Sequence, residues 1–227
     1  MMGLNLLLLS IGLAAQPAGD VPLTERTEAV ELHYGREDGR NTWRAGGYSG
    51  TWSGRGSSSN VFGVRTRSRS RVELTFAGDG SGGSPLTVSC TGGESEFTLA
   101  WITFDKQDLS YACNFSRDGE PVPDSRFELA LQRRGLMGMG RNERAGEMHH
   151  AGHVLRFETQ RLSGVAFPSG RVPGYVIRAD GRDVGGMDYG VMRSTLYLPP
   201  DGDPQRESVL LAALILATFM DPANTGN

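Results

Sequence analysis

Three of the four histidines lie together beyond the middle of the chain, beside a glutamate. They are His149, His150 and His153, with Glu147 just before them. His149 and His153 are four positions apart, so their imidazoles share one face of a helix or of a strand, and imidazole and carboxylate groups are common zinc ligands. The zinc-protease pattern needs a glutamate directly after the first histidine, and this chain has His150 there. The segment predicts structural or surface histidines; the alternative is a metal-dependent hydrolase that uses all four residues.

Four arginines alternate with small polar residues in the segment RTRSRSR, residues 65–71. A period of two places alternate residues on one face of an extended strand, or of two strands joined at this segment. Arg65, Arg67, Arg69 and Arg71 therefore predict a basic, solvent-facing stripe. Such a stripe is a candidate for binding anionic lipid headgroups or glycans. A nucleic-acid partner is not expected, because the formal net charge is -3 and nucleic-acid binding needs an excess of positive charge.

Other catalytic motifs are absent from the sequence. It contains no Gly-x-Ser-x-Gly segment, the motif that presents a nucleophilic serine in many hydrolases. The glycine-rich segment GLMGMG (135–140) lacks a following Lys-Ser or Lys-Thr pair, which a phosphate-binding loop requires. The sequence therefore indicates no cofactor and favours a protein without enzymatic activity.

Two cysteines, Cys90 and Cys113, lie 23 positions apart in strand-like segments. We predict a disulfide between them, which would stabilise the fold by about 3 kcal/mol. The alternative is two buried free thiols. A disulfide fits an exported protein, because disulfides persist in oxidising compartments.

The N-terminus has the pattern of a secretory signal. Residues 4–13 are largely apolar, and Gly12 and Ala14 form a small-x-small cleavage pattern. We predict a signal peptide over residues 1–18, a flexible segment over residues 19–27, and export to the periplasm or outside the cell. The alternative is a short buried N-terminal helix.

Short strand-like segments separated by turn signals make up most of the remaining chain. The 32 glycines indicate many tight turns, and Asp118-Gly119 and Asp180-Gly181 suit two-residue hairpin turns. Residues 132–153 have no clear periodicity and are predicted as a long loop. Such a pattern is typical of a β-barrel or a β-sandwich. Eleven segments are predicted as strands: 28–34, 47–52, 60–67, 71–77, 86–90, 96–104, 109–115, 126–132, 153–162, 174–179 and 194–200.

The segment VLLAALILATFM, residues 209–220, is apolar except for one threonine. Asp203 is a good N-cap and Pro204 suits a first helical position, so we predict a helix over residues 204–220. The apolar run is shorter than the roughly 20 residues that cross a bilayer, and no transmembrane span is predicted in the mature chain.

This helix has no polar face, so it must be surrounded. We therefore predict a mainly β fold, an antiparallel barrel of about 11–12 strands that encloses one hydrophobic C-terminal helix, in a single domain of residues 28–222. The alternative places the helix outside the fold, as a membrane-binding or partner-binding element.

Two segments near the C-terminus carry a resemblance to a known family. GYVIRADGRDVGGMDYG reads as a strand, an Asp-Gly turn and a second strand, and STLYLPPDGDPQRESVLLAALILATFMD reads as a last strand that runs into the helix. This arrangement resembles the tubby C-terminal-like superfamily, which includes phospholipid scramblases and LURP-one-related proteins. The resemblance implies an antiparallel barrel around a central helix. The family's phosphoinositide-binding residues cannot be carried over, because the chain has no lysine-rich site and its one lysine is Lys106.

Taken together, these features predict an exported, non-enzymatic protein of a bacterial envelope. Its expected partner is a lipid or another envelope component, bound through the arginine stripe.

Overall fold

The computed structural model describes residues 21–61, 65–77, 84–94, 98–99, 102–103, 109–131, 143–163, 172–190 and 193–219. The predicted signal peptide lies outside these ranges, as do residues 220–222 at the end of the predicted domain.

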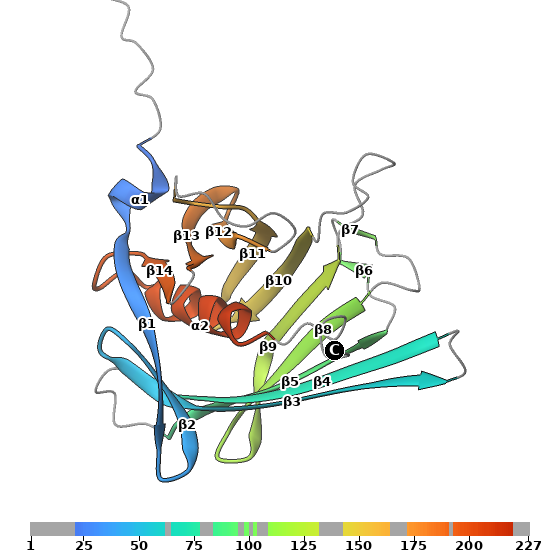
Figure 1. Ribbon diagram of the computed structural model, residues 1–227. Coiled ribbons are helices and arrows are strands. Elements are labelled where there is room, and N and C mark those ends of the chain that lie inside the picture. Colours follow the sequence, from blue (N-terminus) through green and yellow to red (C-terminus); the bar gives the residue numbers. More distant parts are fainter. Residues whose placement is uncertain are drawn as a thin grey trace, which may run out of the picture.

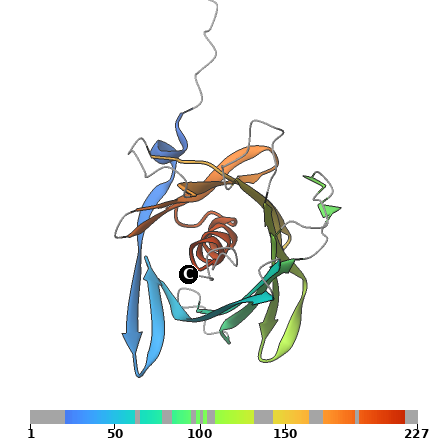
Figure 2. The same ribbon diagram turned by 45° about the vertical axis from the view of Figure 1, so that its right-hand side comes forward.

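Twelve antiparallel strands among the described residues close into a barrel, and one helix, α2, runs through its centre (Figure 1 and Figure 2). Strands that follow one another along the chain pair with each other, and β1 pairs with β14 to close the ring. The predicted mainly β barrel around a C-terminal helix is therefore confirmed. Its strands are β1 (Glu28–Glu37), β2 (Arg40–Ala45), β3 (Tyr48–Val61), β4 (Arg65–Phe76), β5 (Leu86–Glu94), β8 (Leu109–Arg117), β9 (Glu120–Leu131), β10 (Arg144–His150), β11 (His153–Thr159), β12 (Gly174–Ala179), β13 (Arg182–Tyr189) and β14 (Ser194–Leu198).

The strands alternate between buried and exposed residues. In β4, Val72, Leu74 and Phe76 are buried, whereas Arg71 and Glu73 are exposed. Successive side chains of a strand point to opposite faces of the sheet, so this alternation separates an apolar inner face from a polar outer face. The inner faces of the strands pack around α2 and form the hydrophobic core with it.

Helix α2 (Arg206–Ala217) runs through the barrel (Figure 2) and is apolar on every side from Val209 onward. From Val209 to Leu216 every residue is at most 1% exposed. This position excludes the alternative in which the helix lies outside the fold. Neither of the two helices that the structure describes is long and apolar enough to cross a membrane.

The helix begins two residues later than the sequence predicts and ends three residues earlier. Asp203 does act at its start: its Oδ1 accepts the backbone N–H of Gln205 at 2.8 Å, and its carbonyl oxygen accepts the N–H of Arg206 at 3.0 Å. These contacts make a tight turn ahead of the first α-helical residue, so Pro204 lies in that turn rather than in the helix. At the other end, the side chain of Thr218 donates to the Leu214 carbonyl oxygen at 2.9 Å.

The predicted loop over residues 132–153 is wrong in its second half. Arg144–His150 form β10, and the two-residue turn Ala151–Gly152 joins it to β11. Both turn residues have positive φ, 51° and 78°, as a type I′ hairpin requires. The predicted Asp-Gly hairpin turns are confirmed, because Asp118–Gly119 and Asp180–Gly181 have positive φ at both positions.

Three further segments differ from their predictions. Segment 96–104, predicted as one strand, contains two short strands, β6 (Thr98–Leu99) and β7 (Ile102–Thr103), which form a separate two-stranded sheet. The predicted strand 60–67 covers the end of β3 and the start of β4, and the sequence pattern missed β2. Within the segment predicted as flexible, α1 (Leu23–Arg26) forms one helical turn whose Leu23 is 8% exposed.

Candidate functional site

The four residues of the predicted metal site lie on β10 and at the start of β11. Residues of a strand alternate between its faces, so His149 and Glu147 share the outer face, while His150 lies on the inner face and is 6% exposed. There the His150 ring stacks on Phe115, with 5.3 Å between the ring centroids, and its Nδ1 is 3.0 Å from the Ser125 hydroxyl. His153 is the cross-strand partner of His150.

This arrangement divides the predicted ligands between the two faces, with Glu147 and His149 outside and His150 inside. Within the described residues, no group of three or more His, Cys, Asp or Glu side chains is placed to hold a metal ion. The part of the chain that the structure describes therefore offers no metal-ligand set.

Glu147 forms an ion-pair cluster on the outer face of the barrel. Its carboxylate lies 2.5 Å from His149 Nε2 and accepts a hydrogen bond from Arg156 Nε at 3.1 Å. The Arg126 guanidinium is 3.0 Å from the same His149 nitrogen and 4.0 Å from the carboxylate. A neutral imidazole nitrogen either donates or accepts a hydrogen bond. His149 Nε2 therefore bonds either to the Glu147 carboxylate or to the Arg126 guanidinium, but not to both at once.

Partial burial raises the pKa of Glu147, but the hydrogen bonds and charges of His149 and Arg156 outweigh this effect and hold the pKa below its ordinary value. The carboxylate stays ionised and is occupied by basic side chains of its own sheet. We assign this cluster to the stability of the outer face.

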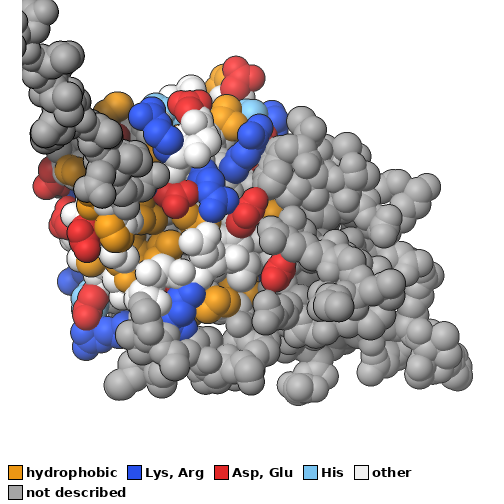
Figure 3. All heavy atoms as spheres, turned by 90° about the horizontal axis from the view of Figure 1, so that it is seen from above, with side chains coloured by type: hydrophobic (Ala, Val, Ile, Leu, Met, Phe, Trp, Pro, Cys, Tyr) orange, Lys and Arg blue, Asp and Glu red, His pale blue; other side chains and the backbone are white. Residues whose placement is uncertain are grey.

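Charges of both signs are interspersed with apolar side chains on the face drawn in Figure 3. Arg178, on β12, pairs with acidic side chains of both neighbouring strands, with Glu158 at 3.2 Å and with Asp183 at 2.8 Å. A face of this mixed kind needs no ligand to balance its charge.

The arginine stripe lies on β4, as its period of two predicts. Arg71 is exposed between the buried residues Ser70 and Val72. Arg65, Arg67 and Arg69 occupy alternate positions of the same strand, and their side chains lie outside the described part of the chain.

The strand register adds a fifth arginine that the sequence analysis missed. Arg55 of β3 is the direct cross-strand partner of Arg71, and both are exposed. Directly opposite residues have Cβ atoms about 4.5–5.5 Å apart, so two like charges there destabilise the sheet. Among the described residues, no acidic side chain forms an ion pair with either arginine. The two guanidinium groups therefore have no described ion pair, and the nearest described acidic residue on this face is the exposed Glu73, two positions along β4 from Arg71.

A cavity of about 370 Å³ opens at the barrel mouth, beside the C-terminal end of α2. Three consecutive strands, β1, β2 and β3, and the end of the helix contribute its walls. Its lining residues are Tyr34, Asn41, Trp52, Gly54, Ala217, Thr218 and Phe219.

Hydroxyl groups of the barrel wall face the last carbonyl groups of this helix. Tyr189 Oη donates to the Leu216 carbonyl oxygen at 2.5 Å, and the same oxygen accepts the backbone N–H of Phe219 at 3.3 Å. Tyr34 Oη lies 3.5 Å from the Ala217 carbonyl oxygen, which is too long for a strong hydrogen bond. Burial raises the pKa of Tyr189 well above its ordinary value, so this phenol stays protonated and acts as a donor.

A buried cation lies next to the same helix end. Arg144 is 4% exposed, and its guanidinium carbon is 5.2 Å from the centroid of the Phe219 ring. Tyr111 packs edge-on against Phe219, with 4.7 Å between the two rings. The sequence carries no signal for this contact, because Arg144, Tyr111 and Phe219 come from β10, β8 and the end of the described chain.

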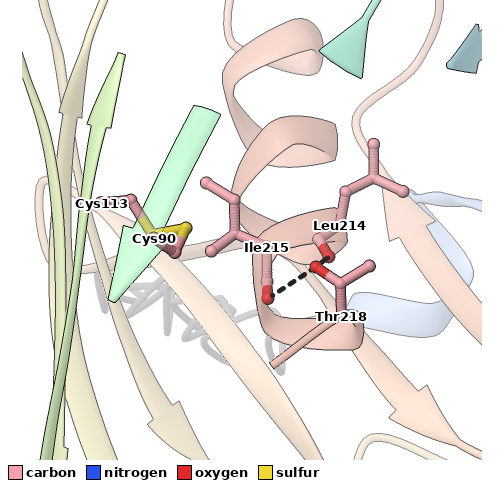
Figure 4. The surroundings of a disulfide bond; sticks show 5 residues. All are labelled: Cys90, Cys113, Leu214, Ile215 and Thr218. Carbon is pink, nitrogen blue, oxygen red and sulfur yellow. Dashed lines mark hydrogen bonds between the residues drawn. A yellow bond between two sulfur atoms is a disulfide. The ribbon is translucent and has the colours of Figure 1, made fainter. Parts of the chain in front are cut away.

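The predicted disulfide is confirmed. Cys90 of β5 and Cys113 of β8 are direct cross-strand partners and are bonded. Both face the core, and Figure 4 shows Ile215 of α2 pointing toward the bridge. The bridge therefore joins two wall strands where they meet the helix.

Comparisons of the chain with models of protein families, with curated proteins and with solved structures found no match. No relative therefore supplies a function, and the tubby-like resemblance of the C-terminal segments stays a prediction.

Proposed function

We propose that this protein is an exported, non-enzymatic component of a bacterial envelope that binds anionic lipid through the outer face of β3 and β4. The observation that carries the proposal is the pair Arg55 and Arg71, which are directly opposite in register and both exposed. Mutual repulsion of two such charges opposes folding. A phosphate group between the two arginines would neutralise their repulsion and bind to both. A guanidinium group can donate two parallel hydrogen bonds to phosphate oxygens.

The length of the two strands supports a surface role. β3 has 14 residues and β4 has 12, and Figure 1 shows both running past the neighbouring strands. Three more arginines of β4 continue the series at alternate positions. Each basic side chain close to an anionic membrane surface contributes about 1 kcal/mol, so Arg55 and Arg71 together provide roughly 2 kcal/mol.

The disulfide supports the export part of the proposal. The bond between Cys90 and Cys113 is of a kind that persists in oxidising compartments and is rare in the cytosol. Together with the signal-like N-terminus, it favours the periplasm or the exterior of the cell.

The test is co-sedimentation of the mature chain with phosphatidylcholine vesicles that contain or lack phosphatidylglycerol. We expect binding only to the anionic vesicles, and weaker binding at high salt because salt screens exposed charges. The double variant Arg55→Ser/Arg71→Ser is expected to lower the affinity about thirtyfold, the equivalent of roughly 2 kcal/mol. Its unfolding temperature should not fall, because the substitution removes a repulsion.

Arg44→Ser is the matched control. Arg44 is also an exposed arginine of the wall, but it is paired with Glu37 at 2.6 Å, so its loss should leave vesicle binding unchanged. Equal binding to neutral vesicles, or a double variant that binds like the parent, would show that β3 and β4 do not bind anionic lipid.

A further inference from the structure

The cavity at the barrel mouth has aromatic walls. Tyr34 and Trp52 contact each other edge to face, with 5.8 Å between the ring centroids, and Phe219 closes the side formed by the end of α2. Tyr34 is 47% exposed, which is unusual for a large apolar ring on this barrel. A volume of about 370 Å³ lies within the range of small-molecule pockets, about 300–1,000 Å³. The walls therefore suit a flat, largely apolar group.

Polar groups of the same cavity suit a ligand that carries a hydrogen-bond donor. Ala217 lines the cavity, and the contact of its carbonyl oxygen with Tyr34 is long, at 3.5 Å. The Asn41 side chain, also in the lining, both donates and accepts. The indole N–H of Trp52 is buried and has no acceptor among the described residues, so a ligand acceptor that reached it would satisfy a donor that is now unpaired.

The electrostatics of the mouth favour a neutral ligand. The C-terminal end of a helix carries a partial negative charge, which disfavours an anion, and the last turn of α2 contains no basic residue to offset it. The residues that line the cavity include no charged side chain that could pair with an ionic ligand, and burying a charge without a partner is costly.

We propose that this cavity is a binding site for a small neutral ring compound that carries an N–H or O–H donor, such as an aromatic amide. This site is separate from the basic face of β3 and β4, because its ligand touches no arginine of that face. The two proposals therefore fail or succeed independently.

The test uses three probes of nearly equal shape and different charge: benzamide, benzoate and benzamidinium. The readout is the indole N–H resonance of Trp52 in the ¹⁵N-labelled mature chain, assigned from its disappearance in Trp52→Phe. We expect a saturable shift with benzamide, and an affinity for benzamide at least about tenfold higher than for either ion, which corresponds to roughly 1.4 kcal/mol.

Two variants check that the cavity itself is the site. Gly54→Val adds a side chain to the cavity wall and should abolish the saturable shift. Ser53→Val is the matched control, because Ser53 is exposed on the same strand, and it should bind benzamide like the parent. Circular dichroism of both variants verifies that they are folded. Arg55→Ser/Arg71→Ser should also leave benzamide binding unchanged.

Three results would overturn the proposal. They are the absence of a saturable shift, equal affinity for the charged probes, and unaltered binding in folded Gly54→Val. Benzamide binding seen only after deletion of residues 220–227 would also overturn it. That result would mean that these residues, and not a ligand, occupy the cavity in the full chain.

Discussion

Ending the chain at Gln205 removes α2 and, with it, six large apolar side chains from the centre of the barrel. They are Val209, Leu210, Leu211, Leu214, Ile215 and Leu216, each at most 1% exposed. Burial of one such side chain stabilises a protein by about 1.5–3 kcal/mol, so the six together contribute roughly 9–18 kcal/mol. A whole domain is stable by only about 5–15 kcal/mol. The truncated chain is therefore expected to be unfolded or aggregated.

No other described element can replace the helix. Without it, the inner faces of the strands, including Phe127, Phe157 and Met187, would meet water instead of α2. Twelve strands make a ring too wide for their own side chains to fill, since barrels of about eight strands already reach that limit.

The assay compares three chains that begin at residue 19: the full mature chain, the chain that ends at Gln205, and the chain that ends at Phe219. Near-ultraviolet and far-ultraviolet circular dichroism and thermal unfolding are measured for each. The chain that ends at Phe219 keeps α2 and its C-terminal contacts and should unfold cooperatively. If the chain that ends at Gln205 also kept a native near-ultraviolet spectrum and a cooperative transition, the helix would not be the core of this fold.

Two further predictions concern buried polar side chains. Arg206 is 7% exposed and donates to the Pro199 carbonyl oxygen and to Glu28. Arg206→Met should lower the free energy of unfolding, measured in urea, by about 1–3 kcal/mol, mainly because it leaves the Pro199 carbonyl unpaired. A change near zero would contradict this role of Arg206. Burial, followed by the charges of Arg117 and His153, holds the pKa of His150 below its ordinary 6.5. The unfolded chain therefore takes up the proton first, and stability should fall as the pH drops below about 6.5. His150→Phe should weaken that pH dependence, and an unchanged pH profile would refute the role of His150.

The sequence was sufficient to predict the barrel and the central helix, because both depend on local patterns. The alternating arginines of residues 65–71 indicate an extended strand. The apolar run of residues 209–220 has no polar face for solvent, so in a β protein the helix must lie inside the closed sheet. The pattern failed at β10 for a physical reason. The inner face of β10 carries Arg144 and His150, whose polar groups pack against Phe219 and Ser125, so polarity does not alternate along the strand.

The binding features depended on tertiary structure. The stripe on β4 could be predicted, but the opposition of Arg55 and Arg71 required the register of β3 and β4. The barrel mouth could not be predicted at all. Tyr34 and Ala217 are 183 positions apart in the chain, and they meet only because the first strand and the last helix lie side by side in the closed barrel.

Both ends of α2 are tied to the first strand of the barrel. Arg206, its first residue, pairs with Glu28, the first residue of β1, at 2.7 Å, and Ala217, its last residue, contacts Tyr34 of the same strand. Since Tyr34 and Ala217 also line the cavity, the helix that completes the core is also one wall of the proposed site. A ligand that binds only this folded arrangement must raise the unfolding temperature, because it stabilises the folded chain by RT ln(1 + L/Kd), where L is the free ligand concentration. Benzamide is therefore expected to stabilise the parent chain against heat and to leave Gly54→Val unaffected.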